Sequence, residues 1–119
     1  MSQPDFARFL ASLQYADSPH LSPERMLRLL GVKRRELAEM CRVRTARFRQ
    51  SPTSPEVQSA LRELVRVLGA AYDRFEDEQS LVFWFKNCPI APLEFHTPAE
   101  LCVRGRAREV LDCLITQRC

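Results

Sequence analysis

The stretch TPAELCVRGRAREVLDCLI, residues 97–115, points most directly to the fold of this chain. Thr97 is a favourable N-cap, Pro98 suits a first helical turn, and Glu100 stands where a capping-box carboxylate reaches back to the cap. Gly105 supplies the left-handed position that ends a helix, and apolar residues then recur at helical spacing. The sequence therefore predicts two short amphipathic helices joined at one glycine, an arrangement typical of a docking module.

Helical signals recur along the rest of the chain, and no run alternates with the period of two that strands show. Ser22-Pro23 and Ser54-Pro55 each combine a capping hydroxyl with a proline in the first turn. We expect about eight helices, including residues 4–14, 22–30, 33–41, 45–50, 56–75, 81–85 and the two described above. The predicted fold is all-α, with short helices in the first half, a long central helix and a small C-terminal helical module.

The central helix carries apolar residues at alternating steps of four and three. Such a seam could bind a second copy of the chain, but further valines widen it into the stripe that is typical of a buried core helix. The segment LVFWF, residues 81–85, is apolar on all sides and is expected to be buried all round or partly under a partner. The candidate residues for a homodimer interface are Leu61, Leu64, Leu68, Phe75 and Trp84.

The length and composition of the chain favour one small domain. With 119 residues, 45% of them hydrophobic, the chain can bury one sizeable core but not two. The N-terminus lacks a basic region followed by an apolar stretch and a small-residue cleavage site, and no segment approaches the length of a bilayer span. We therefore expect a cytoplasmic protein with no membrane association.

The sequence carries no motif for catalysis or metal binding. The five cysteines, an odd number, form no C-x-x-C pair, so we expect reduced thiols that pack as small hydrophobes in place of zinc ligands. His20 and His96 belong to no H-E-x-x-H motif, and three widely separated glycines cannot form a phosphate-cradling loop. We expect a protein that is not an enzyme and that uses no metal, cofactor or small-molecule substrate.

Positive charge is concentrated in one part of the chain. Between Arg25 and Arg49, nine basic residues oppose two acidic ones, a net charge of +7; since the whole chain carries +3, the remainder carries −4. This asymmetry is typical of contact with phosphates, although a basic surface that is merely solvated has the same composition. The candidate DNA-binding residues are Lys33, Arg34, Arg35, Arg44, Arg47 and Arg49.

Two longer motifs stand in the second half of the chain: SPEVQSALRELVRVLGAAYDRFEDEQSLVFWFKN over residues 54–87 and HTPAELCVRGRAREVLDCL over residues 96–114. They resemble the C-terminal toxin-binding domain of the MbcA/ParS/Xre-type antitoxins. The resemblance implies that residues 54–119 form a toxin-binding and dimerisation domain. It also implies a type II toxin–antitoxin system, in which this chain neutralises a RES-domain toxin, an NAD-consuming enzyme related to ADP-ribosyltransferases.

The motif GVKRRELAEMCRVRTARFRQ, residues 31–50, resembles a degenerate Xre-like helix-turn-helix. Arg42 stands where the turn usually has glycine, and Arg44 replaces the usual Ser or Thr cap. The resemblance implies a helix-turn-helix-like bundle over residues 22–53. Residues 1–21 before it are predicted to form an amphipathic helix, whose apolar face indicates a packing role, and a linker. The resemblance also implies duplex DNA as a partner, through which the chain would repress its own operon.

The candidate toxin-binding surface follows from the same resemblance, because the C-terminal end of these antitoxins approaches the NAD pocket of the toxin. Its residues are Leu101, Arg104, Gly105, Arg106, Val110, Leu111, Leu114, Gln117 and Arg118. Two other interpretations stay open. One is a stand-alone helix-turn-helix DNA-binding regulator whose C-terminal half only dimerises, and the other is an interaction module whose basic half binds an acidic protein.

Overall fold

The computed structural model describes residues 3–118, and this part of the chain contains eight α-helices, two short 3₁₀-helices and no β-sheet. In chain order they are α1 (Gln3–Ser12), α2 (Pro23–Leu30), α3 (Arg34–Cys41), α4 (Thr45–Gln50), α5 (Pro55–Ala71), η1 (Tyr72–Arg74), α6 (Glu78–Asn87), η2 (Ala91–Leu93), α7 (Pro98–Val103) and α8 (Ala107–Ile115). The predicted all-α fold is confirmed. Helix α6 is longer than the predicted apolar segment, because the Asp77 carboxylate accepts the Ser80 N–H and caps its start.

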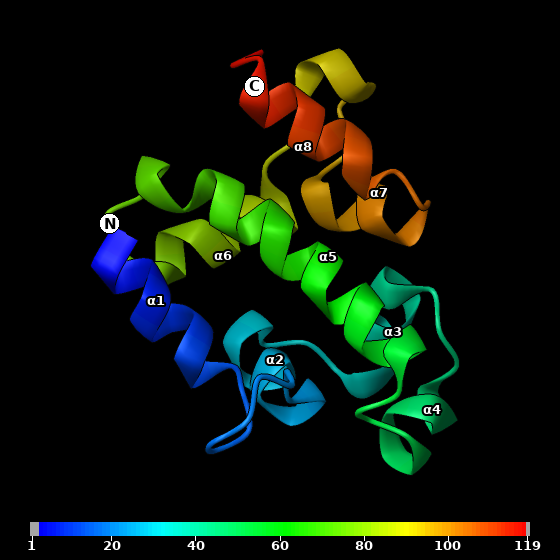
Figure 1. Ribbon diagram of the computed structural model, residues 1–119. Coiled ribbons are helices and arrows are strands. Elements are labelled where there is room, and N and C mark those ends of the chain that lie inside the picture. The colour runs from blue at the N-terminus through cyan, green and yellow to red at the C-terminus, as the bar shows by residue number, and fades with distance from the viewer. Residues whose placement is uncertain (1–2, 119) are drawn as a thin grey trace.

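Helix α5 runs through the middle of the molecule, with α7 and α8 on one side and α1 and α2 on the other (Figure 1). Helix α8 packs directly against α5, and α7 packs against both α6 and α3. The C-terminal helices therefore cover the central helix and also contact the first half of the chain. One continuous core joins residues from all three predicted segments.

The apolar seam of α5 lies at the centre of this core. Leu61, Leu64 and Leu68 are each at most 1% exposed, and they pack against other helices of the same chain. Their assignment to a dimer interface is therefore wrong, because side chains that are covered by their own fold cannot also cover a second copy. The other two candidates, Phe75 and Trp84, are half-buried and pair with each other at 5.7 Å between ring centroids. The homodimer itself stays a prediction.

Local capping signals explain where the helices begin. Ser22 and Ser54 each accept a hydrogen bond at 3.3 Å from the backbone N–H three residues further on, as predicted. Thr97 and Glu100 form the predicted capping box, with reciprocal bonds of 3.1 and 3.0 Å. Gly105 has a φ of 75°, so it occupies the left-handed position that the sequence predicts between α7 and α8.

One buried polar side chain fastens α5 to two loops. The Gln58 side-chain oxygen accepts the Leu21 N–H at 2.8 Å, while its nitrogen donates to the carbonyls of Leu21 and Pro52, each at 2.9 Å. Gln58 is almost fully buried, so these three bonds satisfy backbone groups that would otherwise lack partners in the interior. The linker before α2 and the hinge before α5 are thereby held in place.

Helix α1 has the packing role that its apolar face predicts. The rings of Phe6 and Phe9 each lie 5.2 Å from the ring of Tyr72, centroid to centroid. Gly69 permits this approach, because a Cβ atom at that position would lie 2.9 Å from the Phe6 ring. The N-terminal helix therefore belongs to the same core as the central helix.

Candidate functional site

We define the C-terminal module as residues 90–118. Most of the apolar side chains that were expected to form its docking face are packed inside the protein. Leu101, Val110 and Leu114 are buried, and Leu111 is half-buried against the core. The assignment of the three buried residues to a toxin-binding surface is wrong, because their side chains attach α7 and α8 to the rest of the fold. An apolar face at helical spacing has the same sequence pattern whether it packs within the chain or binds a partner.

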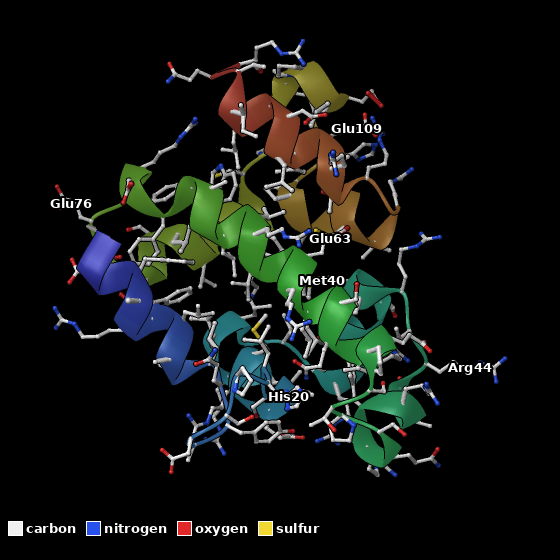
Figure 2. All side chains as sticks on the ribbon, in the orientation of Figure 1. His20, Met40, Arg44, Glu63, Glu76 and Glu109 are labelled. Carbon is white, nitrogen blue, oxygen red and sulfur yellow. The ribbon has the colours of Figure 1, made fainter. Side chains whose placement is uncertain are left out.

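Arg106 also has an internal role. Its guanidinium forms ion pairs with Glu94 at 2.9 Å and with Glu109 at 2.7 Å. Hydrogen bonds from Arg106 hold the pKa of both carboxyls below their ordinary values. Glu109 lies on α8 (Figure 2), whereas Glu94 lies in the loop before α7. Arg106 therefore ties this loop to α8 and is not the free arginine that a toxin contact would require.

The remaining residues of the predicted surface are accessible: Arg104, Gly105, Gln117 and Arg118 are all exposed. Apolar side chains that the sequence did not single out accompany them. Among residues 5–118, the exposed large hydrophobics are Phe83, Phe95, Val103 and Ile115, and the last three belong to the C-terminal module. Phe95 and Ile115 are 70% and 73% exposed, and Val103 is 39% exposed. The module thus presents apolar and cationic groups together.

Arg42 connects the basic region to this module. It adopts the predicted left-handed conformation, with φ 57°, and its guanidinium donates a hydrogen bond of 3.0 Å to the carbonyl oxygen of Val103. A Cβ atom on Gly105 would lie 3.1 Å from the same guanidinium. The contact spans 61 positions of sequence, which is why no local pattern predicts it. The turn after α3 and the turn after α7 therefore form one structural unit.

The six candidate DNA-binding residues fall into two groups. Arg34 pairs with Glu24, Arg35 lies 3.8 Å from Glu39, and Arg47 lies 3.1 Å from Glu56. The other three, Lys33, Arg44 and Arg49, are exposed and have no carboxylate partner within the described part of the chain. Arg44 projects away from the ribbon beside α4 (Figure 2). Among the six candidates, only these three carry charge that is not already paired.

The helix that would read DNA is short. Helix α4 has six residues, and its N-cap, Arg44, makes no side-chain cap bond. Thr45 is the first helical residue, so it does not supply the cap in place of Arg44. A recognition helix of this length offers few side chains to a major groove, whereas phosphate contacts need only exposed cations.

The cysteines whose positions are described form no disulfide with one another, and Cys41, Cys102 and Cys113 are buried; Cys119 lies outside the described residues. Burial raises the pKa of Cys41 and of Cys102 to about 12, so both thiols are protonated at neutral pH. No cluster of three His, Cys, Asp or Glu side chains suited to a metal ion occurs in residues 3–118. These thiols serve as core side chains.

Comparisons with protein-family models, with curated proteins and with solved structures return no match to this chain. None of the helices in residues 3–118 combines the length and the apolar character that crossing a membrane requires. The features that bear on function are thus the exposed apolar and cationic groups of the C-terminal module and the three unpaired cations near α3 and α4.

Proposed function

We propose that this chain is an antitoxin that binds and neutralises a RES-domain toxin through the exposed surface of its C-terminal module. The observation that carries the proposal is that Phe95, Val103 and Ile115 are exposed on the same small module as Arg104 and Arg118. Exposed apolar groups flanked by charge are the composition of a protein-binding surface. The resemblance of residues 54–87 and 96–114 to the antitoxin family names the partner.

The proposed mechanism is steric and electrostatic. On binding, the apolar side chains of the module lose contact with water, while the arginines meet acidic groups of the toxin. Because the module is fixed to α5 through buried residues and to α3 through Arg42, it binds as a preformed surface with little loss of conformational entropy. The bound antitoxin would then cover the entrance to the toxin's NAD pocket.

Rescue of growth tests the proposal. The partner for this test is a cognate RES-domain toxin, and its co-expression with this chain is expected to restore growth that the toxin alone abolishes. The double substitution Arg104→Glu/Ile115→Glu should remove rescue, because it places carboxylates on the proposed surface. Arg49→Glu on α4 makes the same arginine-to-glutamate change outside the proposed surface and should rescue like the unmodified chain. Rescue by the double variant would place the contact elsewhere, and failure of the unmodified chain would reject the proposed function.

Lys33, Arg44 and Arg49 favour a second candidate function, binding of duplex DNA as an operon repressor. If all three contact phosphates, affinity should fall roughly 40-fold between about 50 and about 200 mM salt, since log K falls by about 0.9 per contact for each decade of salt. We expect Arg44→Gln and Arg49→Gln each to lower the salt slope by about 1, and Arg108→Gln on α8 to leave it unchanged. Titration of a labelled promoter fragment measures both quantities. Absence of binding at the lower salt concentration would reject this function.

A further inference from the structure

The loop between α6 and α7 contains two successive residues in an unfavourable backbone conformation. Glu94 and Phe95 have φ values of 56° and 61°, in the left-handed region that L-residues with large side chains rarely adopt. Three other non-glycine residues between positions 3 and 118 have positive φ, but each stands alone in the sequence. Phe95 is the one aromatic residue among them. Backbone strain of this kind concentrates at functional sites.

Surrounding contacts hold the loop in this conformation. The Phe95 N–H donates to the Ile90 carbonyl at 3.0 Å, and the Ile90 N–H donates to the His96 carbonyl at 2.9 Å. The side chains of Ile90 and Leu93 are buried and anchor the loop in the core. Arg106 adds two hydrogen bonds to the Glu94 carboxylate, of 2.9 and 3.3 Å. The position of Phe95 is thus fixed by the backbone bonds of the loop and by the bonds from Arg106 to the neighbouring Glu94.

The Phe95 ring contributes little to the fold that holds it. It is 70% exposed, and it forms no ring pair within the described part of the chain. Glycine or asparagine would suit this backbone conformation better. A bulky aromatic side chain at a strained and exposed position is therefore not explained by stability.

We propose that Phe95 is the anchor of the toxin contact and inserts its ring into an apolar pocket of the toxin. This inference rests on the proposed function. Arg106 links the loop that carries Phe95 to α8, so Phe95 is held in a fixed position relative to Ile115 on the same module. Aromatic side chains that are presented in a fixed position lose little entropy on binding and often dominate the affinity of an interface.

The substitution Phe95→Asn separates binding from folding. Asparagine tolerates left-handed φ, so the melting temperature should be unchanged or higher, whereas the dissociation constant for the purified RES toxin should rise at least about 30-fold. Phe95→Gly is a second variant with the same expectation. The matched control is Phe83→Asn, because Phe83 is 62% exposed but lies on α6; its dissociation constant should stay within about twofold of the unmodified chain.

The possible outcomes distinguish this inference from the function on which it rests. If the unmodified chain binds the toxin and both Phe95 variants bind within about twofold of it, the anchor role is wrong and the proposed function stands. If the unmodified chain does not bind, the proposed function fails first. Light scattering tests whether the Phe95 ring contacts a second copy of this chain in place of the toxin. Phe95 variants that become monomeric while retaining toxin affinity would show such a contact, which also overturns the inference.

Discussion

Leu64→Glu is expected to abolish the cooperative unfolding transition of this chain. Leu64 is 1% exposed on the buried face of α5. Loss of a buried leucine typically costs about 2–5 kcal/mol, and an uncompensated carboxylate in the interior adds to this penalty. Since small domains are stable by only about 5–15 kcal/mol, the substitution should leave little folded protein. Circular dichroism during thermal denaturation measures the effect.

A matched control separates the core from a dimer interface. Ser59→Glu places the same side chain on an exposed position of α5 and should preserve the transition. If the seam of α5 instead covered a second copy, Leu64→Glu would give a folded monomer. A Leu64→Glu protein that unfolds cooperatively and is monomeric by light scattering would therefore contradict the arrangement described above.

Removal of residues 104–119 should have an effect of similar size. The deletion takes away α8, whose Val110, Cys113 and Leu114 are buried against α5. It also removes the Leu114 carbonyl, which accepts a hydrogen bond of 2.8 Å from Arg74. The truncated chain should consequently expose the central helix to water and lose its cooperative transition in urea. Any loss of toxin binding by this truncation would then reflect unfolding.

A shorter deletion tests the terminal residues without this complication. Removal of residues 117–119 leaves α8 intact and gives up the bonds from the Gln117 and Arg118 amides to carbonyls near the end of α8. We expect the free energy of unfolding to fall by about 1 kcal/mol, as for other helix-terminal contacts. The urea midpoint should therefore lie slightly below that of the full chain. A fully cooperative transition in the longer truncation would show that α8 is dispensable for the core.

The helices could be predicted from the sequence because their signals are local. Ser22, Ser54 and Thr97 cap helices from within the next turn, and Gly105 ends α7 through its own backbone. Arg42 likewise occupies the left-handed turn position that the sequence predicts. Signals of this kind depend on residues three or four positions apart, which a single sequence displays directly.

The surface could not be predicted in the same way, because it depends on contacts between distant residues. Leu101, Val110 and Leu114 form an apolar face whose pattern does not tell whether the chain or a partner covers it. Arg106 resembles a free surface arginine until Glu94, twelve positions away, is brought beside it. The exposed position of Phe95 likewise follows from a loop closed by bonds to Ile90.

We propose that the chain inhibits a RES-domain toxin by direct binding. The most direct test is to titrate the purified chain into a cognate RES-domain toxin while following NAD consumption, and to analyse the mixture by gel filtration. We predict that NAD consumption stops once the chain is in stoichiometric amount and that both proteins elute as one complex. Unchanged NAD consumption at a large excess of folded chain, with the two proteins eluting separately, would contradict the claim.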